Sequence, residues 1–165
     1  MAERQPMFFI FVSFICAAAI LFAFPYAAAG VDIPASSGKE VSLQNTFPGA
    51  STFTVQPGVT VTNSGTVISG NGSQVWNITN QGVISSTDTG KHPYDGMYLD
   101  ASAAGKPQVT NFGSITSVAT QSSGAAGLRF VNGGIAHNMG GGRISGLDGV
   151  HSDGSSLTVD NSGSI

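Results

Sequence analysis

The chain has 165 residues and a formal net charge of −3; only 9% of its residues are charged, 41% are hydrophobic and 23 are glycine. It contains no basic stripe, which argues against nucleic acid and against an anionic membrane surface as partners. Cys16 is the sole cysteine, so the fold must be held together without an internal disulfide.

Residues 1–29 have the pattern of a secretory signal peptide. Arg4 supplies a basic start, the 18 residues from Met7 to Phe24 are almost entirely apolar, and small residues place a cleavage site after Ala29. The alternative is an uncleaved membrane anchor, because 18 apolar residues approach the length that spans a bilayer. The small residues favour cleavage, so we expect a signal helix, Sec-type export, and a mature chain that is secreted or exposed at the outer membrane.

Residues 30–54 are expected to form an N-terminal cap, and residues 55–165 carry a repeat. The pentapeptide Asn-x-Gly-x-(Ile/Val) begins at Asn63, Asn80, Asn111, Asn138 and Asn161, the fourth copy having two extra glycines. These asparagines are 17, 31, 27 and 23 residues apart. Apolar and polar residues alternate before each copy, which is the pattern of a strand. Strands and turns recurring at such a period predict an all-β solenoid with one turn per repeat.

Stacked turns would align the apolar residues of successive repeats into inward columns. We expect one column of Val61, Ile78, Val109, Ile135 and Val159, and a second of Val67, Ile84, Ile115, Ile144 and Ile165. The five asparagines are predicted to form a ladder at the corner between the two strands, hydrogen-bonded from turn to turn and tolerating a left-handed backbone. The glycine two residues later is expected to supply a positive φ.

A second motif recurs in register with the first. Gly96, Gly127 and Gly149 each begin a Gly-apolar strand ahead of the third, fourth and fifth asparagine. The segments "VTNSGTVISG", "VTNFGSITS", "DGMYLD", "AAGLRF" and "LTVDNSGSI" together resemble the passenger repeats of bacterial autotransporters, the type V secretion proteins. This resemblance covers roughly residues 55–165 and implies a right-handed parallel β-helix of about five coils on a cell surface.

The chain also departs from that family. Autotransporters carry a C-terminal translocator barrel, and nothing in this sequence resembles one. The sequence ends at Ile165, directly after a repeat motif and without a polar capping segment. We therefore expect a fragment of a longer array, attached to a membrane only through the signal peptide or a missing barrel.

Three sets of residues are candidates for a site. Asp148, His151 and Asp153 could hold a metal or act as acid and base. However, Asp95 and Asp100 occupy the same slots two motifs earlier, with Tyr98 in the slot of His151, so the acids are expected to belong to the repeat. We therefore expect no catalytic residue, no metal and no cofactor. A second set, Lys91, His92 and Tyr94, lies in an irregular link and is expected to form a projecting contact loop. The last, Trp76, is expected to stack on a sugar or pack outside a turn.

The preferred hypothesis is a non-enzymatic surface module with a structural or adhesive role, whose partners are glycans or proteins of a host surface or matrix. A first alternative is a polysaccharide lyase or hydrolase on the same scaffold, which would need carboxylates, alone or with a base, converging on one face. A second alternative is a secreted β-sandwich, which predicts antiparallel hairpins.

Overall fold

The computed structural model describes residues 30–89, 94–101, 105–120 and 124–165. The predicted signal peptide at 1–29, with its cleavage site at Ala29, and the loop residues Lys91 and His92 lie outside these ranges. Within the described ranges, no helix combines the length and apolar character that crossing a membrane requires.

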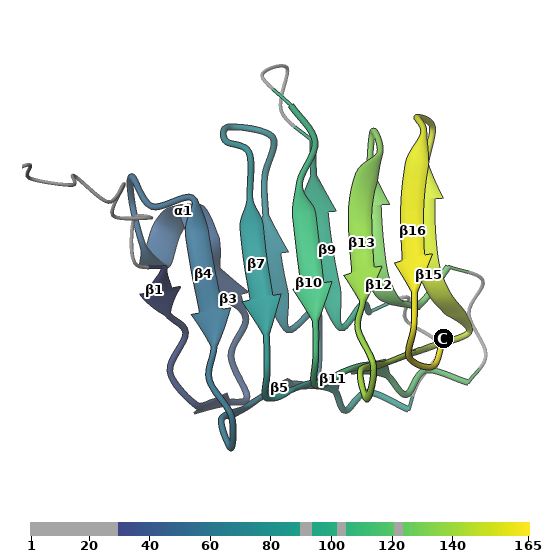
Figure 1. The fold of residues 1–165 in the computed structure, drawn as a ribbon. Coiled ribbons are helices and arrows are strands. Elements are labelled where there is room, and N and C mark those ends of the chain that lie inside the picture. The colour runs from purple at the N-terminus through teal and green to yellow at the C-terminus, as the bar shows by residue number, and fades with distance from the viewer. Residues whose placement is uncertain (1–29, 90–93, 102–104, 121–123) are drawn as a thin grey trace, which may run out of the picture.

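In the described part of the chain, sixteen strands form three sheets, named here A, B and C (Figure 1). Sheet A contains β1 (Val31–Asp32), β4 (Thr52–Val55), β7 (Asn77–Asn80), β10 (Gln108–Asn111), β13 (Gly134–Asn138) and β16 (Leu157–Asn161). Sheet B contains β2 (Ser36–Ser37), β5 (Thr60–Asn63), β8 (Val83–Ser86), β11 (Ser114–Ser117) and β14 (Arg143–Ser145). Sheet C contains β3 (Val41–Ser42), β6 (Ile68–Gly70), β9 (Met97–Asp100), β12 (Ala126–Val131) and β15 (Asp148–Asp153).

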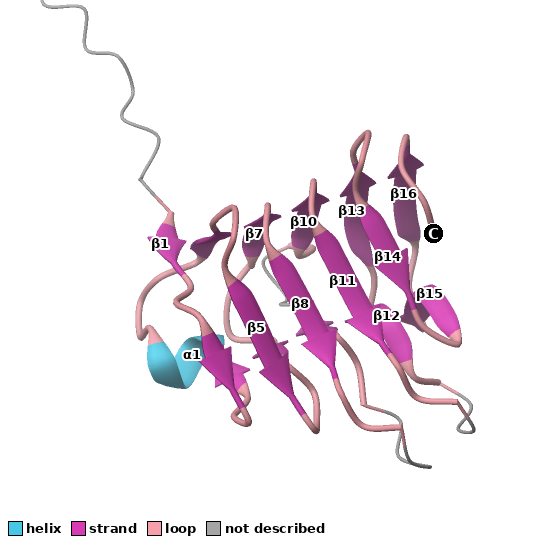
Figure 2. Cartoon of the chain, turned by 90° about the horizontal axis from the view of Figure 1, so that it is seen from below, coloured by secondary structure: helices cyan, strands magenta, loops and turns pink. Residues whose placement is uncertain are grey.

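Consecutive strands lie in different sheets, and each strand pairs with the strand three positions away in the chain. Every strand pairing between the described residues is parallel, and Figure 2 shows the strands of sheet B running side by side in one direction. The three sheets wind into a β-solenoid of about four turns. The predicted all-β solenoid is thus confirmed, and the antiparallel β-sandwich is wrong.

The predicted cap is built into the solenoid. Residues 31–42 place one short strand in each sheet, so they form the first turn. The only helix in the described ranges, α1 (Leu43–Thr46), follows β3 and contacts β3 and β6. Leu43 is fully buried, and the ring of Phe47 lies 5.5 Å from that of Phe53. These contacts join α1 to the hydrophobic core.

The core consists of three inward columns, one from each sheet. Sheet A contributes Phe53, Ile78, Val109 and Ala136, and Val159 continues this column into the last turn, where it is 39% exposed. Sheet B contributes Val61, Ile84, Ile115 and Ile144. Sheet C contributes Val41, Ile68, Met97, Leu128 and Val150. Each column places side chains of successive turns one strand spacing apart, about 4.8 Å, which lets turns bury a face that none could bury alone.

Four expected column positions are corrected. Val61 lies in sheet B and pairs with Ile84, not in the column of Ile78. Val67 is buried but lies next to β6 and sheet C, where its carbonyl accepts a hydrogen bond from the Val41 N–H at 2.8 Å. In β13 the inward residue is Ala136, which is fully buried, so Ile135 faces outward. The predicted core residue Ile165 belongs to the last turn and is 49% exposed.

Four of the five repeat asparagines form a hydrogen-bonded ladder at the end of sheet A. Asn80 Nδ2 donates to Asn111 Oδ1, Asn111 Nδ2 to Asn138 Oδ1, and Asn138 Nδ2 to Asn161 Oδ1, each at 2.8 Å. The first three asparagines are buried. None of the four has a positive φ, so the expected left-handed backbone is wrong for them.

Asn63 does not belong to this ladder. It ends β5 in sheet B, where it pairs with Ser86, and its Nδ2 donates to the carbonyl of Thr66 at 2.8 Å. The place beside Asn80 in the preceding turn is taken by Val55. The asparagines of the ladder are 23 to 31 residues apart, so the 17-residue step from Asn63 to Asn80 is too short for a full turn.

In the second, third and fifth copies of the repeat the glycine is required by crowding rather than by a positive φ, which corrects the expected role. Gly82, Gly113 and Gly163 are absent from the positive-φ residues. A Cβ on Gly113 would lie 2.1 Å from the carbonyl oxygen of Gly82, and one on Gly163 would lie 2.2 Å from that of Gly142. The corner therefore brings the backbones of neighbouring turns too close for any side chain.

Replacing Gly113 by Ala is expected to lower the free energy of unfolding by about 1 to 3 kcal/mol, because the new methyl group would displace the backbone of the neighbouring turn. Gly140→Ala is the matched control, since a Cβ there would meet no atom within 4 Å. It should change stability by no more than about 0.5 kcal/mol. Urea denaturation of both variants measures the difference, and equal midpoints would contradict the close approach.

Candidate functional site

The outer faces of the three sheets carry different side chains. One outward row of sheet B consists only of small hydroxyl residues: Ser37, Thr62, Ser85, Thr116 and Ser145. The corresponding row of sheet A holds Thr54, Thr79, Thr110, His137 and Asp160. On sheet C the row is Ser42, Ser69, Tyr98, Arg129 and His151. Aromatic and charged groups with further acids around them are thus gathered on the outer face of sheet C.

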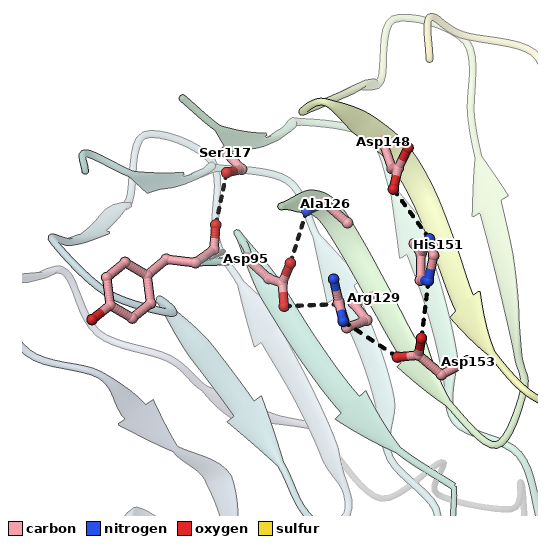
Figure 3. A network of polar contacts seen from close by, with 8 residues as sticks. Asp95, Ser117, Ala126, Arg129, Asp148, His151 and Asp153 are labelled. Atoms are coloured by element: carbon pink, nitrogen blue, oxygen red, sulfur yellow. Dashed lines mark hydrogen bonds and ion pairs between the residues drawn. The ribbon is translucent and has the colours of Figure 1, made fainter. Parts of the chain in front are cut away.

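A chain of ionic contacts crosses this face (Figure 3). The carboxylate of Asp95 accepts a hydrogen bond from the Ala126 N–H at 2.8 Å and lies 3.2 Å from Arg129 Nε. Arg129 Nη1 in turn lies 3.3 Å from Asp153 Oδ2. The side chain of Asp95 is almost fully buried, whereas that of Asp153 is about half exposed. Arg129 therefore links an internal carboxylate to one at the surface.

His151 extends the chain to the last turn of sheet C. Its Nδ1 lies 3.1 Å from Asp148 Oδ2 and its Nε2 lies 3.0 Å from Asp153 Oδ1. Both ring nitrogens thus face carboxylates of the same strand, β15. Among the residues that the structure describes, no His, Cys, Asp and Glu side chains are grouped so as to hold a metal ion. The arrangement orients the imidazole within a polar surface.

The strand register explains how acids from different repeats meet. Tyr98, Arg129 and His151 occupy equivalent positions of β9, β12 and β15, and Asp100 and Asp153 flank Val131 in the same way. The repetition of these slots can be read in the sequence, but the role of Arg129 as the base that joins them cannot. The partners of Arg129 lie in the turns on either side, and only stacking brings them within reach of one side chain.

Burial raises the pKa of Asp95 from 3.8 to about 6, although the Ala126 N–H and the Arg129 charge act in the opposite direction. Taking a carboxylate out of water disfavours its charged form, and here this cost exceeds the stabilisation from its partners. The 3.2 Å contact between Arg129 Nε and the Asp95 carboxylate is an ion pair whose hydrogen-bond alignment is poor.

Asp95 should therefore make the fold less stable as the pH rises. Between about pH 4 and pH 6 the folded chain retains an Asp95 proton that the unfolded chain has already lost, so raising the pH through this window favours unfolding. In Asp95→Asn this contribution disappears, because the side chain no longer titrates. We expect the stability of the wild type relative to Asp95→Asn to be greatest near pH 4 and to decrease up to about pH 6.5. Thermal denaturation across this range measures it, and parallel profiles would show that Asp95 does not titrate there.

A cleft of about 350 Å³ opens on the N-terminal part of the same face. Its lining comes from the first three turns: Glu40, Gln44, Thr66, Ser69, Gly70, Asn71 and Tyr98. The cleft borders the ionic contacts, because Tyr98 and Arg129 are neighbours across β9 and β12. The cleft was not predicted from the sequence, because its lining residues are separated by up to 58 positions and contain no motif.

Trp76 is not a surface-contact residue, which corrects its expected role. It is fully buried, its ring lies 6.1 Å from that of Phe53, and its Nε1 donates to the carbonyl of Asn71 at 2.6 Å. Trp76 lies beneath Gly70, where any Cβ would come within 2.7 Å of the indole nitrogen. Of the other predicted contact residues, Tyr94 is half-buried, and its carbonyl accepts a hydrogen bond from Ser117 Oγ at 2.7 Å.

Comparison with protein-family models, with curated proteins and with solved structures gave no match for this chain.

Proposed function

We propose that this chain is an exported bacterial surface protein of the autotransporter-passenger type, whose β-solenoid has a structural or adhesive role. Three features support this proposal. The first 29 residues have the composition of a signal peptide, the repeats resemble those of autotransporter passengers, and the described residues form a solenoid. A solenoid without disulfides also suits a chain that must cross a membrane unfolded before it folds outside.

The observation that carries the adhesive role is the difference between the outer faces. Sheet B presents a row of small hydroxyl groups, whereas sheet C presents Tyr98, Arg129, His151 and several carboxylates beside a cleft. Aromatic and arginine side chains contribute a large share of the energy at binding surfaces. The partner is proposed to be a glycan or a protein of a host surface or matrix, engaged by this face without a cofactor. With acids outnumbering bases, nucleic acid is not a proposed partner.

Export and adhesion are tested separately on the full chain expressed in a bacterial host. N-terminal sequencing of the protein recovered outside the cytoplasm is expected to begin at Gly30. Binding to immobilised matrix proteins and glycans is then compared for wild type and His151→Ala/Asp153→Ala. This variant removes the His151–Asp153 pair of the sheet C face together with the contacts of His151 to Asp148 and of Asp153 to Arg129. The control is His137→Ala/Asp160→Ala, which removes a similar exposed pair, 2.9 Å apart, from sheet A.

Binding is expected to weaken at least tenfold in the sheet C variant and to stay unchanged in the sheet A variant. Retention of the uncleaved chain in the cytoplasm would disprove export. Absence of binding to every surface tested, or equal losses in the two variants, would disprove adhesion through sheet C.

A polysaccharide-acting enzyme is the second candidate, and one observation favours it. The fold brings Asp95, Arg129, Asp153, His151 and Asp148 onto one face, which is the convergence of carboxylates and bases that such chemistry needs. Incubation with a panel of pectins and other glycans tests it. Product release that is lost in His151→Ala but kept in His137→Ala would establish this activity and displace the adhesive proposal.

A further inference from the structure

The cleft on sheet C has a floor and two walls that come from different turns. Thr66, Ser69 and Asn71 form the floor in the second turn. Gln44 of α1 stands on the side of the first turn, and Tyr98 of β9 on the side of the third. First and third turns are two strand spacings apart, about 10 Å, and the side chain between them in this row, Ser69, is small. A hollow therefore remains between Gln44 and Tyr98.

The floor of this cleft is held in place by hydrogen bonds. The carbonyl of Asn71 accepts the Trp76 Nε1–H, and the Asn71 side chain accepts the Ser73 N–H at 3.1 Å. The Asn71 N–H donates to Gln44 Oε1 at 3.3 Å, while Gln44 Nε2 donates to Ser42 Oγ at 2.7 Å. These bonds connect the buried core to the lining of the cleft. A ligand would then lose little binding energy in ordering the site.

The chemical groups of the lining define the class of ligand. Glu40 offers two acceptor oxygens and also accepts a hydrogen bond from Ser69 Oγ. Thr66 and Ser69 bring hydroxyl groups that both donate and accept. Tyr98 adds an aromatic ring with a phenol, whose pKa is raised by burial and then by Asp100, so its proton is retained at neutral pH. No Lys or Arg is among the described lining residues.

These features disfavour an anionic ligand and favour a neutral one. A ligand carboxylate or sulfate would face the Glu40 carboxylate, and the described lining residues include no Lys or Arg to offset it. Asp100 lies two residues beyond Tyr98 on the same strand. A neutral ligand rich in hydroxyl groups can donate to Glu40 and to the Ser69 oxygen and accept from Thr66 and Tyr98. Its apolar face can pack on the Tyr98 ring. The volume of about 350 Å³ lies at the small end of the usual range for ligand sites.

We propose that this cleft binds one neutral sugar residue of a glycan chain, oriented by Glu40 and Gln44 and packed against Tyr98. This inference rests on the proposed adhesive function and specifies the chemistry of its partner. The open outer face of sheet C lets the remainder of the glycan continue along the solenoid towards Arg129 and His151.

The test uses the full chain and isothermal titration with two sets of probes. The first set contains neutral oligomers of glucose, mannose, galactose and N-acetylglucosamine, and the second contains uronic acid oligomers of matched length. Tyr98→Ala removes the ring, and Ser69→Leu fills the floor of the cleft while leaving Tyr98 in place. Thr79→Ala is the control, because Thr79 is a half-buried outward residue of sheet A. Circular dichroism shows whether each variant is folded.

At least one neutral oligomer should bind, with affinity at least tenfold weaker in both Tyr98→Ala and Ser69→Leu and unchanged in Thr79→Ala. Preference for uronic acid oligomers, binding of a lysine-rich peptide in place of sugars, or affinity that survives in folded Ser69→Leu would overturn the proposal. If no oligomer binds while adhesion to matrix proteins through sheet C persists, the sugar site is wrong and the adhesive function stands. If adhesion is absent as well, both are wrong.

Discussion

Ile115→Asp is expected to lower the free energy of unfolding by about 4 kcal/mol or more, which is a large share of the stability of a domain this size. Ile115 is fully buried in β11, between Ile84 and Ile144 of the adjacent turns. An aspartate there has no partner for its carboxylate and also removes apolar contacts with both neighbours. Far-UV circular dichroism during urea denaturation measures the loss, and the variant is expected to be largely unfolded at moderate temperature.

Val83→Asp provides the matched control, because it introduces the same charge in place of a β-branched residue on the neighbouring strand β8. Val83 faces outward, is 40% exposed and pairs with Ser114 in the adjacent turn. A solvated carboxylate at this position should change stability by no more than about 0.5 kcal/mol. If Ile115→Asp were as stable as Val83→Asp, the inward column of sheet B would be wrong.

Asn111→Leu is expected to cost about 3 kcal/mol although it replaces a polar side chain in the interior by an apolar one of similar size. Asn111 is fully buried, accepts a hydrogen bond from Asn80 and donates to Asn138. Its Nδ2 also lies 3.2 Å from the carbonyl oxygens of Gly113 and Arg143. Leucine would leave several of these buried groups without a partner, and each such loss costs about 1 to 3 kcal/mol before any relaxation. Equilibrium denaturation in urea measures the change.

Asn161→Leu makes the same substitution at the last position of the ladder, where the side chain is exposed. Asn161 accepts from Asn138 Nδ2, but Asn138 Nδ2 also contacts the carbonyls of Gly142 at 3.2 Å and Ser164 at 3.0 Å. Its loss should therefore cost under about 1 kcal/mol. Equal destabilisation at Asn111 and Asn161 would show that burial and shared partners do not set the strength of the ladder.

The solenoid also determines where a binding surface can form. Inward positions are taken by core columns and the corner by the asparagine ladder, so variation between turns is accommodated on outward positions and in links. The outward residues vary most on sheet C, where the row changes from Ser69 to Tyr98, Arg129 and His151 in successive turns. Sheet B stays almost uniform. A surface with distinct neighbouring groups can recognise a partner, whereas a uniform row offers the same contact at every turn.

The sequence by itself determined the all-β class, the repeat and most of the inward residues. Alternation of apolar and polar residues assigns the two faces of a strand, and Asn80, Asn111, Asn138 and Asn161 mark the same corner because each full turn takes a similar length of chain. These features are local or periodic, so they can be read without knowing which strands touch. The all-parallel stacking that they predict is what the structure contains.

Only the tertiary structure decided which residues of neighbouring turns stack on one another and which side chains this stacking brings together. Asn63 lies outside the ladder, Ala136 and not Ile135 faces the core, and Trp76 is buried beneath Gly70. The stacking also joins Asp95, Arg129 and Asp153 across three turns and opens the cleft beside Tyr98. The physical reason is that register between turns depends on the lengths of the links and on packing across the whole core, and a one-residue shift reverses which side chain faces inward.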